Sequence, residues 1–211
     1  MPGGARRLTG PAVAVLLLAV ALMLRLWGLE RESLWLDEAF TYDFTSGPFL
    51  AIFERTARDA HPPLFYMGVH AWRSVWGDTD GVIRGYAVMW SLAGLLFAGL
   101  LARSMLGGTV ALVTMAALAI HPLDIFYSQE ARMYSMTAAG LTALGLLYWH
   151  WITQAGPAWS ARRIWFGAGA AATSVALLYT HYLAALFLAA YGVTALAVFV
   201  RRRAWGDAGA L

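Results

Sequence analysis

The sequence predicts an all-α protein that crosses a membrane several times. Of its 211 residues, 60% are hydrophobic and 13% are charged, which is about half the charged fraction of a typical soluble domain. The mean hydropathy is +0.60, and apolar runs close to the roughly 17–25 residues that cross a bilayer recur along the chain. We therefore expect a polytopic helical bundle with no separate soluble domain.

Six apolar segments are long enough to be expected as transmembrane helices. The first follows Arg6 and Arg7, and because no small-residue cleavage site comes after it, we interpret it as an uncleaved span rather than a signal peptide. The six expected spans are residues 11–29, 83–101, 104–122, 133–152, 164–180 and 182–200.

The distribution of arginine predicts the orientation of these spans. Every basic residue in the chain is an arginine. If the N-terminus is cytoplasmic, six alternating spans place Arg103, the pair 162–163 and the run 201–203 on the cytoplasmic side, as the positive-inside rule requires. The same alternation puts eleven of the twelve acidic residues on the outer side, with Asp207 as the exception. We therefore expect a multi-pass protein of the cell (inner) membrane whose chemistry lies at its periplasmic or extracytoplasmic face.

Two broad classes of partner or site are excluded by composition. The sequence pI of about 9.4 does not indicate nucleic acid, because the arginines lie mostly at the ends of apolar segments and form no basic stripe. The chain has no cysteine, so neither a disulfide framework nor a thiolate metal site can form.

The first outer loop, about residues 30–81, is expected to contain two helices that lie on the membrane surface. In 46–60, Ser46 is a plausible N-cap and Pro48 a first-turn residue. The segment 62–76 is too short to cross comfortably. It carries Phe65 on an apolar helical face and Tyr66 on a polar one, which is the pattern of a helix in the interface plane.

An acidic pair is the first candidate for chemistry. Asp37 and Glu38 follow the apolar stretch 34–36, just beyond the first span. Carboxylates at an apolar membrane boundary are costly to desolvate, and such groups serve as general bases. The alternative is an ordinary acidic loop start that is exposed to water.

A single histidine, His61, opens the second surface helix ahead of two prolines. The sequence leaves open whether it binds a metal, contacts a phosphate or only caps the helix. It contains no H-E-x-x-H motif and no closely spaced histidine pair. A divalent metal would therefore need Asp37 and Glu38 beside His61, or His181 brought in by the fold.

The last two outer loops supply the remaining candidates. In 127–134, Glu130 and Arg132 lie between tyrosines at the mouth of the expected bundle, where ionisable groups are expensive and usually functional. We expect these two to pair, and the alternative is a salt bridge that only fixes the loop. The turn at His181 and Tyr182 either lines the same cavity or belongs to an interfacial aromatic belt.

Taken in order, four segments resemble those of a known enzyme group. Residues 34–39 (LWLDEA), 61–66 (HPPLFY), 127–134 (YSQEARMY) and 180–182 (THY) are similar to motifs of membrane glycosyltransferases of the GT-C fold. The resemblance is strongest to the bacterial branch of the dolichyl-phosphate-mannose protein mannosyltransferase family (family 39). This branch also resembles the aminoarabinose transferase that acts on lipid A. The resemblance covers nearly the whole chain. Because relatives are much longer, we expect residues 1–211 to be the N-terminal, catalytic module of such an enzyme.

The resemblance implies a reaction and roles for individual residues. A sugar would move from a polyprenyl-phosphate-linked donor in the membrane lipid to a hydroxyl of a protein, lipid or polysaccharide acceptor, with inversion. Asp37 matches the catalytic aspartate of the family and Glu38 its neighbour. The residues expected near the donor phosphate are His61, Glu130, Arg132, Tyr134, His181 and Tyr182.

Charge supports this assignment of roles. A sugar on a lipid phosphate already has a good leaving group, so the enzyme needs a base for the acceptor and a cation for the departing phosphate. Asp37 is the expected base and Arg132 the first candidate cation, because guanidinium binds phosphate oxygens bidentately. The alternative is a non-catalytic transporter or scaffold subunit. A transporter would place ionisable groups near the middle of the membrane, whereas the interiors of the last four spans carry none.

Overall fold

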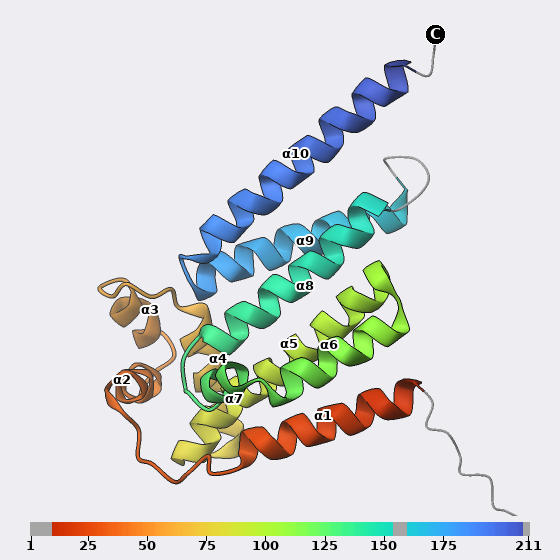
Figure 1. Cartoon of the computed structure of the whole chain (residues 1–211). Coiled ribbons are helices and arrows are strands. Elements are labelled where there is room, and N and C mark those ends of the chain that lie inside the picture. Colours follow the sequence, from red (N-terminus) through yellow and green to blue (C-terminus); the bar gives the residue numbers. More distant parts are fainter. Residues whose placement is uncertain (1–9, 154–159, 209–211) are drawn as a thin grey trace, which may run out of the picture.

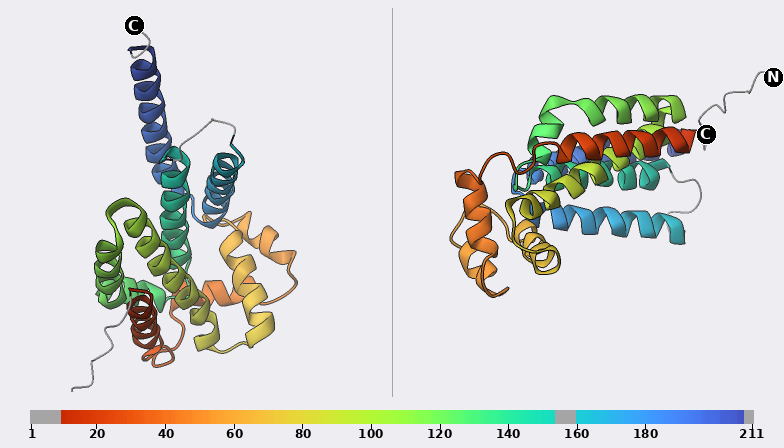
Figure 2. Two further views of the ribbon diagram at one scale, coloured as in Figure 1. Left: turned by 90° about the vertical axis from the view of Figure 1, so that its right-hand side faces the viewer. Right: turned by 90° about the horizontal axis from the view of Figure 1, so that it is seen from below.

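The computed structural model describes residues 10–153 and 160–208, and within these ranges every regular element is an α-helix. The expected all-α fold class is confirmed for this part of the chain. The long helices run in broadly similar directions (Figures 1 and 2). They are α1 (Gly10–Leu26), α5 (Asp80–Leu106), α6 (Gly108–Ile120), α8 (Tyr134–Thr153), α9 (Ala161–Thr180) and α10 (Ala184–Ala208).

The other four helices, none longer than 13 residues, lie at one end of these six. Figure 1 shows α2 (Leu36–Thr45), α3 (Ala51–Thr56) and α4 (Leu64–Trp76) gathered there, with α7 (Pro122–Ser128) beside them. We call this the short-helix end. A large hydrophobic cluster lies within it and joins α4, the start of α5 and the segment before α8. Its fully buried members include Phe65, Tyr66, Val69, Ile83 and Met133.

Membrane-spanning character is clear for fewer helices than the sequence suggests. Among the described residues, α5 is the single helix that is long and apolar enough to cross a membrane unaided. Helices α6 and α7 meet the same criterion only together, as one span bent by 62°. Helix α1 and the segment Ala184–Val198 are apolar but shorter. The arrangement with six spans therefore remains a prediction.

The segment between α1 and α5, expected as the first outer loop, contains three helices instead of the expected two. The acidic pair does not sit in a loop but in the first turn of α2. Ser46, expected to begin a helix, instead follows α2, where its N–H donates to the carbonyl of Asp43 over 3.2 Å, and the next helix starts at Ala51. The beginning of α2 escaped sequence reasoning because its N-cap position is Trp35, a residue type that gives no capping signal.

Helix α4 was expected, but its polar face is buried. Tyr66 is fully buried and Arg73 is 9% exposed, although both fall on the face predicted to meet water. Helix α2 covers this face: the ring of Phe44 packs against Tyr66 with centroids 5.2 Å apart, and the guanidinium of Arg73 lies over the ring of Tyr42.

An arginine in α1 stabilises the break between α6 and α7. Arg25, which could have extended to the membrane surface as long basic side chains do, is fully buried and forms an ion pair with Asp124. Pro122 has no N–H, so it cannot donate to the carbonyl of Leu118 four residues earlier. Arg25 donates to that carbonyl over 3.2 Å and to the carbonyl of Ala119 over 3.1 Å.

We predict that Arg25→Leu destabilises the fold by about 3 kcal/mol, because it leaves Asp124 without its ion-pair partner and the carbonyl of Ala119 without its side-chain donor. The double variant Arg25→Leu/Asp124→Leu should recover part of this loss, since no partly buried charge then lacks a partner. Thermal unfolding in detergent micelles measures both. An Arg25→Leu protein as stable as the wild type would contradict the anchoring role of this side chain.

Candidate functional site

The expected site residues come from four separate segments that meet at the short-helix end. The connection is made by Glu38, whose side chain is fully buried. The guanidinium of Arg84 donates to both of its oxygens, over 2.9 Å from Nε and 2.6 Å from Nη2. The N–H of Ala131 donates to it over 2.9 Å and that of Trp35 over 3.3 Å. A carboxylate that accepts four hydrogen bonds within the fold has a structural role and is not available to a substrate.

Arg84 has a structural role as well. Besides Glu38 it donates to three backbone carbonyls of the connection between α1 and α2, those of Leu29 (2.8 Å), Glu32 (2.7 Å) and Ser33 (3.2 Å). Sequence reasoning missed this residue. The available signal was an arginine next to Ile83, at the edge of an apolar run, since such a charge needs a buried partner.

Asp37 differs from its neighbour, since its carboxylate is partly exposed and has no hydrogen-bond or ion-pair partner in the part of the chain that the structure describes. Consecutive helical residues point about 100° apart, so the carboxylate of Glu38 faces the interior while that of Asp37 faces the surface. The backbone carbonyl of Asp37 accepts from Arg132 Nη1 over 3.2 Å. Of the two carboxylates proposed from the sequence, Asp37 is therefore the one available for chemistry.

Arg132 is 4% exposed, yet no ion pair compensates it within residues 10–153 and 160–208. Besides Asp37, its contacts are the hydroxyl of Tyr66 at 3.5 Å and His61 Nε2 at 3.3 Å. Its Nε is buried without a hydrogen-bond partner. The expected ion pair with Glu130 is not formed. A buried guanidinium with neutral neighbours is costly for a fold and typical of a site that binds anions.

Glu130 lies at the edge of the same cluster. Burial raises the pKa of its carboxyl, the nearby Glu38 and Asp37 raise it further, and Arg132 opposes the shift. Burial also raises the pKa of the Tyr66 hydroxyl to about 12, so this group stays protonated beside Arg132. Among the carboxyls of this cluster, the one with a raised pKa is thus Glu130, which lies between α7 and α8.

Two histidines complete the cluster. His61 contacts the carboxylate of Asp59 over 3.1 Å through Nδ1, and its ring lies 6.2 Å from that of His181. The ring of Tyr134 is 6.4 Å from the ring of His181. Burial, followed by the proximity of His61 and Arg132, lowers the pKa of His181. Of the two positions expected for His181, the structure therefore has the one beside the other site residues and not the one in an aromatic belt.

Two expectations from the sequence find no counterpart in this geometry. Tyr182 is 59% exposed and its side chain makes no polar or ring contact with other described residues. The divalent-metal hypothesis loses its ligand set, because Glu38 is occupied by Arg84 and His61 by Asp59 and Arg132. No group of three histidine or acidic residues among the described residues could hold a metal ion.

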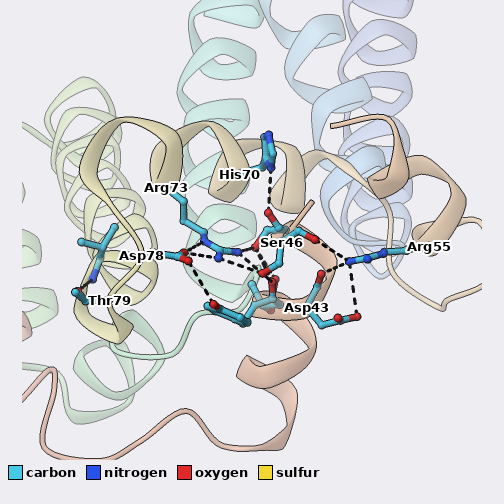
Figure 3. A network of polar contacts seen from close by, with 11 residues as sticks. Asp43, Ser46, Arg55, His70, Arg73, Asp78 and Thr79 are labelled. Carbon is cyan, nitrogen blue, oxygen red and sulfur yellow. Dashed lines mark hydrogen bonds and ion pairs between the residues drawn. The ribbon is translucent and has the colours of Figure 1, made fainter. Parts of the chain in front are cut away.

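A second polar network holds the far end of α2 (Figure 3). Arg73 donates to the carbonyl of Tyr42 over 3.0 Å and to Ser46 Oγ over 3.1 Å, and it forms an ion pair with Asp78. The Nδ1–H of His70 donates to the carbonyl of Thr45 over 3.0 Å. These donors meet the carbonyls that a helix C-terminus leaves unpaired. Helix α2 is thus held at both ends, by Glu38 at its start and Arg73 at its finish.

Comparisons with known proteins return no match: no family model, no curated protein and no solved structure is significantly similar to this chain.

We predict that Glu38→Gln destabilises the protein by about 3 kcal/mol, because the substituted amide leaves the charge of Arg84 unpaired in the interior. A double variant with Arg84→Gln should lose less than the sum of the two single variants, since the two side chains act as one pair. Denaturant unfolding gives the three values. Strictly additive losses would show that the pair is not energetically coupled.

We predict that Glu130→Gln raises the thermal midpoint at pH 8. Because the pKa of folded Glu130 lies above the ordinary 4.5, its contribution to stability is present at low pH and is lost as pH rises through the folded pKa. Glutamine removes this loss, so the two proteins should converge in stability below about pH 4.5. A midpoint lowered at pH 8 would contradict the assignment.

Proposed function

We propose that this chain is a membrane glycosyltransferase that moves a sugar from a polyprenyl-phosphate-linked donor to an acceptor hydroxyl. The proposal includes six membrane spans, a cytoplasmic N-terminus and a site at the outer face of the cell membrane, reached by protein, lipid or polysaccharide acceptors. It rests on the resemblance of four sequence segments to GT-C enzymes. The observation that carries it is that the carbonyl of Asp37 accepts a hydrogen bond from Arg132, a buried cation. Among the described residues, the carboxylate of Asp37 has no partner and Arg132 has no counter-ion.

The two groups match the two demands of the reaction. Asp37 takes the proton of the acceptor hydroxyl as that oxygen bonds to the anomeric carbon. The bond from this carbon to the phosphate oxygen breaks at the same time, and the electron pair leaves with the phosphate, which gains one negative charge. Arg132 stabilises that charge in surroundings from which water is largely excluded. A single displacement of this kind inverts the anomeric centre.

Other groups of the cluster support these two. Glu38 fixes the position of Asp37 on one side and of Arg132 on the other, since it binds the N–H of Ala131. Tyr66 and His61 contact the guanidinium without bringing a negative charge to it, which leaves its charge available to a ligand. Glu130, close enough to the pair to be affected by both charges, lies where the acceptor or the sugar would have to pass.

We predict that Asp37→Asn abolishes transfer by at least about 10²-fold, the usual contribution of a general base. The assay supplies labelled polyprenyl-phosphate sugar to membranes that contain the protein and measures label in any acceptor fraction. Asp43→Asn is the matched control, because Asp43 lies on the same helix and its side chain is 70% exposed. The control should transfer normally.

Two results would overturn the proposal. Wild-type transfer by Asp37→Asn would remove Asp37 as the base. Label that crosses sealed vesicles without becoming attached to an acceptor would favour a transporter. Equal unfolding midpoints of the two variants exclude misfolding as the cause of a loss.

A further inference from the structure

The hydrogen-bond donors around Arg132 show which groups remain free to bind a ligand. Arg132 donates from Nη1 to the carbonyl of Asp37 and the hydroxyl of Tyr66, and from Nη2 to His61. Its Nε–H has no partner, although the residue is 4% exposed. A buried donor without an acceptor costs about 1–3 kcal/mol unless something binds it. This N–H is therefore the donor of Arg132 that an acceptor oxygen of a ligand would satisfy.

The tautomer of a neutral His61 follows from its two contacts. A guanidinium can only donate, so His61 Nε2 must accept from Arg132, and the proton of a neutral ring must lie on Nδ1. That N–H points to the carboxylate of Asp59 at 3.1 Å. Both nitrogens are thereby used, and His61 has no donor left for a ligand.

His181 has the opposite tautomer. The N–H of Leu183 donates to Nδ1 over 3.1 Å, so a neutral His181 carries its proton on Nε2. This Nε2–H has no hydrogen-bond partner in the part of the chain that the structure describes. The groups facing the ring are His61, Tyr134 and Arg132. Burial lowers the pKa of His181, as do the charges of His61 and Arg132, which favours the neutral ring.

We infer that the Nε2–H of neutral His181 and the Nε–H of Arg132 bind oxygens of one phosphate group, and that the site is matched to a phosphodiester monoanion. This inference rests on the proposed function and specifies how the donor lipid is held. The charge balance supports a monoanion: Arg84 is neutralised by Glu38, His61 lies against the carboxylate of Asp59, and Arg132 remains as the uncompensated cation of the cluster within the described residues. The carboxylates of Asp37 and Glu130 disfavour a second negative charge on the ligand.

A sugar linked to a lipid through a phosphodiester carries one negative charge, whereas the lipid phosphomonoester left after transfer carries up to two at alkaline pH. A site with one uncompensated cation binds the first without excess charge. Repulsion from Glu130, and from Asp37 once it has released the acceptor proton, weakens the hold of the site on the second, which eases release of the product.

The test uses two substitutions at one position. Farnesyl methyl phosphate, a lipid phosphodiester, is the probe, and its binding to the full chain in detergent is measured by calorimetry at pH 8. In His181→Asn, the side-chain oxygen replaces Nδ1 as acceptor for Leu183, but the Nε2 donor is lost. In His181→Gln, the amide N–H reaches the position of Nε2.

We predict that His181→Asn weakens binding of the probe by about 10-fold or more, the range for a hydrogen bond to a charged group. His181→Gln should stay within about 3-fold of the wild type, since it retains a neutral donor. Tyr179→Phe is the matched control from the end of α9, because Tyr179 is 57% exposed and its hydroxyl contacts none of the described residues. It should bind the probe as the wild type does.

Three outcomes would overturn the inference: equal binding by the wild type and His181→Asn, equal weakening by Asn and Gln, or farnesyl phosphate binding more than about 10-fold more tightly than the diester at pH 8. Binding is measured without turnover, so its failure is separate from that of the proposed function. If the Asn–Gln difference is observed while the wild type transfers no sugar, the phosphate site stands and the glycosyltransferase proposal falls. If the wild type transfers sugar but the two variants bind the diester alike, the reverse holds.

Discussion

The arrangement of the short-helix end depends on one buried carboxylate. Glu38 receives two hydrogen bonds from Arg84 in α5, one from the backbone ahead of α2 and one from the loop ahead of α8. Three segments far apart in sequence are thereby held at one point. An ion pair with 7% and 1% side-chain exposure is costly to assemble and still more costly to break. It therefore contributes less to net stability than to fixing a single arrangement of the residues on either side of it.

A similar principle operates at the junction of α1, α6 and α7. The proline that bends the chain removes a backbone donor, and Arg25 replaces it from another helix. In both places an arginine completes the hydrogen bonding of irregular backbone at the end of a helix bundle. The irregular segments that carry the candidate site are therefore rigid for identifiable reasons, and each depends on one guanidinium.

Much of this arrangement could be predicted from residue patterns, and the remainder could not for physical reasons. Hydropathy placed the long helices, and charge placed Asp37, His61, Arg132 and His181 at one end. Hydropathy also suggested more spans than helix length and composition support. What single residues could not reveal was their partners. Adjacent carboxylates look alike in sequence. Only the fold shows that Glu38 is bound by Arg84, whereas the carboxylate of Asp37 has no partner in the described part of the chain. Equally, the spacing of Glu130 and Arg132 suggested an ion pair, but their side chains diverge to different neighbours.

The isolation of Arg132 has a thermodynamic consequence. A guanidinium kept from water and from carboxylates raises the free energy of the folded protein, and the neutral groups around it offset only part of that cost. Any anion that meets it recovers the difference as binding free energy. Arg132 then lowers the stability of the fold and contributes to affinity through the same charge, so substitutions that stabilise the protein at this position should be those that reduce its function.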